Sequence, residues 1–208
     1  MDGTSLDSEL LVVATWLRVF ARLDPSRKLT LRELEAFSGP PLLDSCRKCF
    51  PDRDPLEVEK IYIEEAKPLY PTLANLFPGE REALTELKEN GCKLAINSNK
   101  LHAQAVMALQ EQGLQTLFDA VIAGGDAPMK PDPAGVHRIL VELDVKKENA
   151  VYLGDSTFDA LTARNAGIAS FLVRFYPRSI PKGLEPNRYI DSYQELPEVL
   201  RSWWKLTH

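Results

Sequence analysis

The sequence is poor in the features that mark secreted and membrane proteins. Only three of its 208 residues are cysteine, and this odd, sparse set suits a reducing compartment better than a disulfide framework. No apolar run approaches the roughly 20 residues that a membrane helix needs. The N-terminus also lacks the basic-then-apolar layout of a signal peptide. We therefore expect a cytoplasmic protein that neither spans nor binds a membrane.

Positive charge is scarce as well. Lys and Arg together number 25 against 30 Asp and Glu, which gives a formal net charge of -5. Nucleic acids and anionic membranes select clustered Lys and Arg, so neither partner is predicted. With 44% hydrophobic and 26% charged residues, the composition is that of an ordinary globular protein. Chemistry on a small molecule is the default expectation, and the sequence carries no signal for an oligomeric state.

The nearest approach to a cysteine motif is "CRKC", in which Cys46 and Cys49 have CxxC spacing. A structural zinc site needs about four ligands, and the sequence has no second pair at metal-binding spacing. We expect two ordinary helix cysteines, with a redox or metal role as the alternative.

Residues from about Asp7 to Leu69 read as helices without a strand signal. Apolar residues recur with a helical period in "SELLVVATWLRVFARL". In "TLRELEAFSG", Thr30 and Glu33 are predicted to form a capping box, and Gly39 with the prolines after it ends the helix. Further helices are predicted in "LLDSCRKCF" and "PLEVEKIYIEEAKPLY".

From residue 76 onward, amphipathic helices alternate with short apolar runs. The predicted strands are "CKLAINS", "FDAVIAG", "NAVYLGDS" and "ASFLVRF", and "SYQELPEVLRSWWKL" is a predicted terminal helix. Alternating helices and strands are typical of a parallel sheet covered on both faces. We therefore predict the α/β class.

Polar residues follow three of these strands, where an open parallel sheet binds its ligands. Ser98 and Asn99 follow the first strand, Lys130 the second, and Asp155 and Asp159 the third. The two aspartates could hold Mg²⁺ or simply cap the following helix. Lys130 could neutralise a phosphate or be a solvated surface lysine. Ser98 and Asn99 could cradle an oxyanion or cap a helix.

In order and spacing, these residues resemble motifs two, three and four of the haloacid dehalogenase superfamily of phosphohydrolases. The resemblance is closest to the phosphoglycolate phosphatase-like branch, whose familiar forms are "TNK", "KPDP" and "GDSxxD" followed by "AxxAG". This sequence has "NSNK", "KPDP", "GDSTFD" and "ARNAG". The resemblance spans the whole chain. It implies a Rossmann-like core at residues 1–8 and 76–208, with a small all-helical cap inserted at 9–75.

The opening "MDGTSLDS" resembles the family's first motif, DxDGT, from its variable position onward. Met1 takes the variable position, Asp2 is the second aspartate, and Ser5 replaces a usual leucine or valine. The first aspartate, which is the nucleophile in the family, would lie one residue before Met1. A start assigned at an internal methionine would account for this opening. An in-frame apolar run ending in Asp upstream of Met1 is the expected result of translating the preceding codons.

The resemblance implies magnesium-dependent hydrolysis of a small phosphomonoester, phosphoglycolate-like or a sugar phosphate, through an aspartyl-phosphate. Asp2 would protonate the leaving oxygen, later activate water, and help to hold the metal through its backbone carbonyl. Ser98 and Lys130 would hold the phosphoryl oxygens. Asp155 would bind the magnesium, with Asp159 beside it.

Two other functions share these motifs: a catalytically inactive phosphate- or metal-binding regulatory protein, and a phosphosugar mutase with a different cap. Magnesium-dependent hydrolysis of an aryl phosphate, abolished by Asp155→Asn, would rule out the inactive relative. In the cap, "SGPPLLDSCRK" is the best candidate for a loop near the ligand. There Arg47 or Lys48 could meet an anion, although solvated charge is the commoner role.

The resemblance also places the family's first strand immediately before the nucleophile, in the middle of the sheet. Without that strand, roughly 5–10 backbone hydrogen bonds are lost, and each buried group left unsatisfied costs about 1–3 kcal/mol. The sum rivals the roughly 5–15 kcal/mol that stabilises a whole domain. We expect a chain without this strand to be strongly destabilised.

Overall fold

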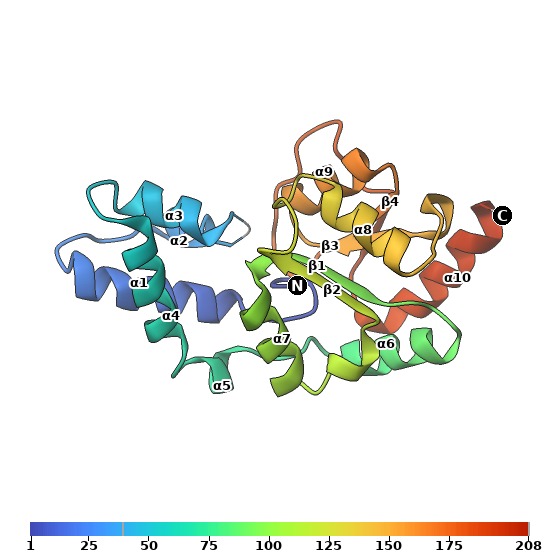
Figure 1. The fold of residues 1–208 in the computed structure, drawn as a ribbon, viewed down its shortest axis with the longest axis horizontal. Coiled ribbons are helices and arrows are strands. Elements are labelled where there is room, and N and C mark those ends of the chain that lie inside the picture. The colour runs from blue at the N-terminus through green and yellow to red at the C-terminus, as the bar shows by residue number, and fades with distance from the viewer. Residues whose placement is uncertain (39, 208) are drawn as a thin grey trace. The chain divides into compact units, whose positions relative to one another are not determined.

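The structure is a computed structural model that describes residues 1–38 and 40–207, and these form two compact units (Figure 1). The helical unit contains Asp2 and Leu6–Asn75, and the α/β unit contains Met1, Gly3–Ser5 and the described chain from Leu76 onward. Gly39, which we predicted to end a helix and to belong to a cap loop, lies outside the described residues. In the part of the chain that is described, no helix is long and apolar enough to cross a membrane.

The helical unit is built from the helices that the sequence predicts and one short addition. They are α1 (Glu9–Leu23), α2 (Leu31–Glu35), α3 (Leu42–Cys49), α4 (Pro55–Ala66) and α5 (Tyr70–Leu73). The predicted capping box is present at the start of α2. The Thr30 side chain accepts from the Glu33 amide, and the Glu33 carboxylate accepts from the Thr30 amide.

Aromatic side chains fill the core of the helical unit. Trp16 stacks on Phe37 with ring centroids 4.6 Å apart, and the centroids of Phe20 and Phe50 lie 4.8 Å apart. Cys46 is buried in the same core, and burial raises the pKa of its thiol to about 12. A reactive cysteine needs a lowered pKa, so Cys46 is a packing residue.

The α/β unit alternates helices and strands, which confirms the predicted class. The strands are β1 (Ala95–Leu101), β2 (Ala120–Gly124), β3 (Val151–Gly154), β4 (Ala169–Val173) and β5 (Arg188–Ile190). The helices are α6 (Glu80–Glu89), α7 (His102–Glu111), α8 (Ala134–Glu142), α9 (Thr157–Ala166) and α10 (Leu196–Thr207), with short 3₁₀ turns at Gln115–Leu117, Lys147–Asn149 and Tyr193–Glu195. Helices α8 and α9 lie on one side of the strands, and α6 and α10 lie on the other (Figure 1).

The strands form two parallel sheets where the sequence led us to expect one. β1 pairs with β2, with Ala95 opposite Ala120, and β3, β4 and β5 form the second sheet in that order. Across the described residues, β1 has β2 as its one strand neighbour and β3 has β4. The sheet is therefore interrupted between β1 and β3, the two strands that carry the predicted site residues.

Candidate active site

The predicted site residues of the α/β unit come from the carboxyl ends of its strands. Ser98 and Asn99 lie in the second half of β1, Lys130 lies between β2 and α8, and Asp155 directly follows β3. Asp159 lies in the first turn of α9.

Lys130 and Asp159 form the centre of the site. The Lys130 Nζ donates to Asp159 Oδ1 over 2.7 Å, and only 11% and 4% of the two side chains are exposed. Asn99 fixes the backbone of the lysine, because its Oδ1 accepts from the Lys130 amide over 2.7 Å and its Nδ2 donates to the Lys130 carbonyl over 3.3 Å. Asn99 therefore connects β1 to the loop that carries the cation.

The charges of this pair stabilise each other. Burial alone would lower the pKa of Lys130 and raise that of Asp159, because both charged forms lose solvent. The attraction between the ammonium and the carboxylate outweighs burial, so the net pKa shift is upward for Lys130 and downward for Asp159. Both groups are charged at neutral pH, and a fixed positive charge is held at the edge of the sheets.

Asp159 also caps its own helix. Its Oδ2 accepts from the Asp155 amide over 3.2 Å, from the Ser156 amide over 3.0 Å and from the Ser156 hydroxyl over 2.6 Å. A Cβ at position 154 would lie 2.2 Å from the Cβ of Asp159, so Gly154 permits this turn. The capping role, one of the alternatives that the sequence left open for Asp159, is therefore observed, and the same carboxylate pairs with Lys130.

Asp155 has a different set of neighbours. Its Oδ2 accepts from Arg178 Nε over 3.1 Å, and its Oδ1 accepts from the Thr4 hydroxyl over 3.3 Å. Gly3 has a φ of 73°, and a Cβ there would lie 2.4 Å from Asp155 Oδ2. The Tyr193 hydroxyl donates to the Thr4 carbonyl over 2.7 Å, which holds this loop in place.

We did not predict Arg178 from the sequence. It follows the carboxyl end of β4 in the segment "RFYPRS", so the strand-end rule that selected the other residues could have found it. Its guanidinium supplies a second positive charge to the site, beside the one on Lys130.

The Ser98 side chain is buried, and its Oγ accepts from the Lys100 amide over 3.1 Å. Because the oxygen accepts that bond, its own hydrogen points elsewhere and can donate to an anion.

Asp2 is grouped with the helical unit, where its Oδ1 accepts from the Ser8 hydroxyl over 2.8 Å. Its sequence neighbours Met1 and Gly3 belong to the α/β unit. In the predicted cap loop, Arg47 forms an exposed ion pair with Asp44 over 2.8 Å. Of the two roles considered for Arg47, this contact is the solvent-exposed one.

The resemblance implies Mg²⁺, and Asp155 suits that ion. The pKa of Asp155 is raised by its burial and by the neighbouring Asp159 charge, against the opposing effect of Arg178, so a further cation would stabilise its charged form. Among the described residues, no group of three or more His, Cys, Asp or Glu side chains forms a ready-made metal cluster. Mg²⁺ commonly needs only one or two carboxylates and takes water and phosphate oxygens for the rest. Asp155 fits this role, although its oxygens also accept from Arg178 and Thr4. The Asp159 oxygens accept from Lys130, Ser156 and the Asp155 amide.

Comparison with known proteins identifies the family. The model of the haloacid dehalogenase-like hydrolases matches residues 1–173. The chain belongs to this family. The predicted family is thereby confirmed, and by family the protein is a phosphatase-type hydrolase.

Relatives of this haloacid dehalogenase-like hydrolase include two kinds of phosphatase. The pyrophosphatase PpaX of Halalkalibacterium halodurans is 28% identical over 96% of this chain and 94% of its own. A phosphoglycolate phosphatase of Rhodobacter capsulatus is 35% identical over 62% of this chain and 58% of its own.

Solved structures show the same fold. A haloacid dehalogenase-like family hydrolase from Streptococcus pneumoniae superposes with a TM-score of 0.81 at 24% identity, covering 98% of this chain and 95% of that one. CbbY from Rhodobacter sphaeroides, crystallised with phosphate, gives a TM-score of 0.81 at 22% identity and covers 94% of this chain and 93% of that one.

Proposed function

We propose that the protein is a magnesium-dependent phosphatase that hydrolyses a small phosphomonoester through an aspartyl-phosphate. The buried Lys130–Asp159 pair carries the proposal, because it fixes a cation near Asp155 at the edge where a parallel sheet binds ligands. Keeping a lysine charged inside a protein is costly unless it is paired. The pairing keeps the Lys130 ammonium charged inside the protein, where it can donate to an anion.

The proposed reaction has two displacements. In the first, the family's nucleophilic aspartate forms a bond to phosphorus while the bond to the leaving oxygen breaks, and Asp2 gives that oxygen its proton. Water then attacks phosphorus, transfers its proton to Asp2, and the aspartate is released with inorganic phosphate. Ser98 and Lys130 bind the phosphoryl oxygens in both steps.

Asp155, Asp2 and Asp159 are the proposed metal residues, and they have unequal parts. Asp155 is the proposed carboxylate ligand, with the Asp2 carbonyl as a second oxygen. Asp159 lies beside the ligand, and its direct task is to hold Lys130. When bound, the magnesium would neutralise charge on the phosphoryl oxygens.

The helical unit is the proposed cap, which would exclude water and select the substrate. A two-carbon or sugar phosphate is our preferred substrate, and pyrophosphate is the competing one that the PpaX relatives suggest. The free state of Cys46, Cys49 and Cys92 supports the proposed cytoplasmic location, where thiols stay reduced.

Anion binding by the 208-residue chain tests the site without requiring turnover. We would titrate the protein with 2-phosphoglycolate, a hexose phosphate and pyrophosphate by calorimetry, in Mg²⁺ and in EDTA. The expected result is binding that Mg²⁺ strengthens and that Lys130→Met weakens at least about tenfold, since a charge-assisted hydrogen bond contributes about 1.5–3 kcal/mol.

Lys182→Met is the matched control, because Lys182 is an exposed lysine of the same unit. If the two variants bind all three anions equally well, Lys130 does not bind phosphate and the proposal fails. The order of the three affinities in the unmodified chain ranks the substrate classes.

A further inference from the structure

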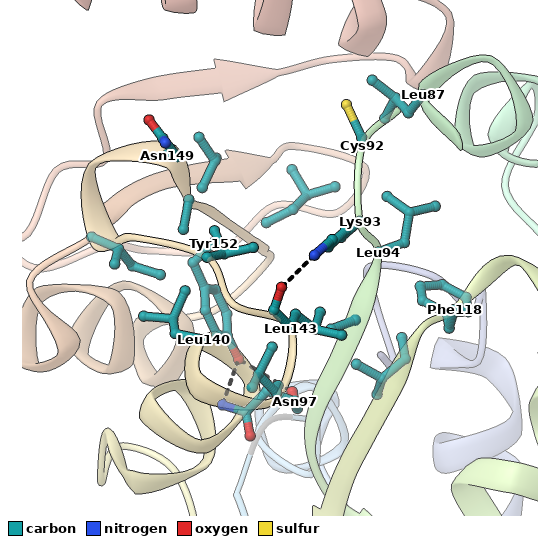
Figure 2. Close-up of a pocket in the computed structure, with 18 of the residues that line it drawn as sticks. Leu87, Cys92, Lys93, Leu94, Asn97, Phe118, Leu140, Leu143, Asn149 and Tyr152 are labelled. Carbon is teal, nitrogen blue, oxygen red and sulfur yellow. Dashed lines mark hydrogen bonds between the residues drawn. The ribbon is translucent and has the colours of Figure 1, made fainter. Parts of the chain in front are cut away.

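The candidate active site is divided between the two parallel sheets of the α/β unit. Lys130 lies in the loop after β2, whereas Asp155 and Asp159 follow β3. Among the described residues, β1 and β3 are not paired with each other, and a cavity of about 660 Å³ lies between them. Figure 2 shows how side chains join the two strands, since the Tyr152 hydroxyl donates to the Asn97 carbonyl over 3.2 Å. The position of Lys130 relative to the two aspartates therefore depends on side-chain contacts.

The loop of Lys130 is held through the backbone groups of Lys130 and Pro131. These groups are the amide and the carbonyl of Lys130 and the carbonyl of Pro131, since proline has no N–H. Asn99 Oδ1 accepts from the Lys130 amide over 2.7 Å, and Asn99 Nδ2 donates to the Lys130 carbonyl over 3.3 Å. Asn165 Nδ2 donates to the Pro131 carbonyl over 2.9 Å. We call the side chains of Asn99 and Asn165 the asparagine clamp.

The two residues of the asparagine clamp come from different sides of the interrupted sheet. Asn99 lies in β1, and Asn165 lies in the last turn of α9, the helix that follows β3. Asn165 belongs to the segment "ARNAG", to which the proposed reaction assigns no task. The clamp therefore holds one loop both from a strand of the first sheet and from a helix that packs on the second.

Helix α9 holds Lys130 at two places. In its first turn, Asp159 Oδ1 accepts from the Lys130 ammonium over 2.7 Å. In its last turn, Asn165 holds the residue after the lysine. Six residues separate Asp159 from Asn165, which is about 9 Å along a helix axis. The lysine side chain therefore runs along α9, and the helix fixes both of its ends.

The direction in which Lys130 donates depends on both of these ends. A lysine ammonium carries three N–H donors on a flexible four-carbon stem, and Asp159 Oδ1 accepts from one of them. If the backbone of Lys130 shifts, the ion pair can form again in another rotamer, but the other donors then point elsewhere. Pairing with Asp159 keeps the lysine charged, whereas the asparagine clamp fixes where its donors point.

We propose that Asn99 and Asn165 are positioning residues, which aim the Lys130 ammonium at a bound phosphoryl group by holding the backbone of its loop. This inference rests on the proposed function, which assigns Lys130 to the phosphoryl oxygens. Asn99, for which the sequence suggested an oxyanion contact, acts on the anion through Lys130. Asn165 fixes the loop of the first sheet to the helix that carries Asp159.

Anion binding by Asn165→Ala tests the asparagine clamp, and Asn90→Ala is the matched control. Asn90 is also an exposed asparagine at the end of a helix of the α/β unit, and its Nδ2 donates to the Glu86 carbonyl over 2.7 Å. Each substitution removes one side-chain bond to a backbone carbonyl, so both should lower the melting temperature by a similar few degrees. The two variants differ in that the carbonyl bound by Asn165 belongs to the loop of Lys130.

We would titrate these variants with 2-phosphoglycolate in Mg²⁺ by calorimetry. A charge-assisted hydrogen bond contributes roughly tenfold to 100-fold to an affinity, and a misdirected donor loses part of it, so Asn165→Ala should bind at least about fivefold more weakly than the unmodified protein. Asn90→Ala should bind like the unmodified protein. Asn99→Ala removes two bonds and should lose more affinity than Asn165→Ala. Asn165→Gln keeps an amide at an exposed position and should recover most of the lost affinity.

The reactivity of Lys130 gives a second measurement that needs no anion. Acetic anhydride acylates uncharged amines, and mass spectrometry locates each modified lysine. Lys130 should react slowly in the unmodified protein and in Asn90→Ala, because its side chain is paired and 11% exposed. In Asn165→Ala and Asn99→Ala it should react at least about fivefold faster, because local opening of the loop exposes the amine more often. The exposed Lys182 should react at the same rate in every variant.

Equal affinities of Asn165→Ala and Asn90→Ala for 2-phosphoglycolate would overturn the proposal, as would equal acylation rates of Lys130 in the two variants. If the unmodified protein binds no 2-phosphoglycolate, the proposed function fails, and the acylation rates alone decide whether the asparagine clamp positions Lys130. If Asn99→Ala does not fold, the variants at the exposed position Asn165 decide the question.

Discussion

The core of the helical unit is filled by its own side chains, whereas the α/β unit contains a cavity between its two sheets. The core of the helical unit is packed with aromatic rings, which contact one another: Trp16, Phe20, Phe37 and Phe50. In the α/β unit, about 660 Å³ lies between β1 and β3. The backbone explains the difference. A helix bonds its amides and carbonyls internally, whereas a strand depends on a neighbour at each edge.

The units also differ in what they bury. The helical unit relies on apolar contacts, while the α/β unit buries Lys130 and Asp159 as a pair and Glu80 beside the Phe77 amide. Buried charge costs stability unless it is matched. In the α/β unit, therefore, the cavity reduces close packing, and the buried charges of Lys130 and Asp159 lose contact with water.

Removing the Lys130 charge should have the largest effect. Lys130→Met leaves the Asp159 carboxylate buried without its cation, and breaking one partner of a buried ion pair costs about 3–5 kcal/mol. Urea unfolding followed by circular dichroism measures the loss. Lys182→Met should unfold like the unmodified protein, and an unchanged midpoint for Lys130→Met would show that the pair does not stabilise the α/β unit.

Trp16→Ala tests the claim that aromatic packing holds the core of the helical unit. Trp16 is 1% exposed, and truncating a buried aromatic residue costs about 3–5 kcal/mol. We expect faster hydrogen exchange in α1 and α4. The neighbouring Leu17, 47% exposed, is the control, and a comparable loss in Leu17→Ala would contradict a core centred on Trp16.

Glu80 should make the stability of the α/β unit depend on pH. Burial raises the pKa of Glu80 from 4.5 to about 7, although the Phe77 amide, the α-amino group of Met1 and Arg81 oppose it. The folded state then binds more protons than the unfolded state between these values, so stability falls as the pH rises from about 4.5 to about 7, by up to about 3 kcal/mol. Denaturant midpoints across this range measure the slope.

Glu80→Gln should remove that slope, because an amide does not titrate and can still accept from the Phe77 amide. Glu82→Gln, an exposed change on the same helix, should keep it. A slope that persists in Glu80→Gln would assign the pH dependence to another group.

The smallest predicted effect lies in the helical unit. Thr30→Ala removes the N-cap of α2, and the loss of such a cap costs about 1 kcal/mol. The melting temperature should fall by a few degrees, whereas Ser26→Ala, outside the helix, should leave it nearly unchanged. Equal shifts of the melting temperature in the two variants would show that the capping box does not stabilise the helical unit.

The sequence predicted the longer helices and four strands because each has a clear apolar period and a start or stop signal. β5 was missed because it has three residues, of which two are exposed, so it shows neither an apolar run nor alternation. The extra helix α5 is a single turn that contains a proline. Such short elements depend on tertiary contacts that no local pattern encodes.

At the site, strand-end positions predicted that Lys130, Asp155 and Asp159 would gather, because parallel strands share an edge. The strand-end rule also covers Asn99 and Arg178, but it does not predict which residues they contact. The hydrogen bonds between Asn99 and the Lys130 backbone and between Arg178 and Asp155 join residues 31 and 23 positions apart. Only the fold sets those distances.

The central claim is that the buried Lys130–Asp159 pair holds a cation where a phosphoryl group binds. The most direct measurement is calorimetric titration of folded Lys130→Met and Lys182→Met with 2-phosphoglycolate in Mg²⁺. The account predicts binding at least about tenfold weaker in Lys130→Met, because a charge-assisted hydrogen bond contributes about 1.5–3 kcal/mol, and unchanged binding in Lys182→Met. Equal affinities in the two variants would contradict the account.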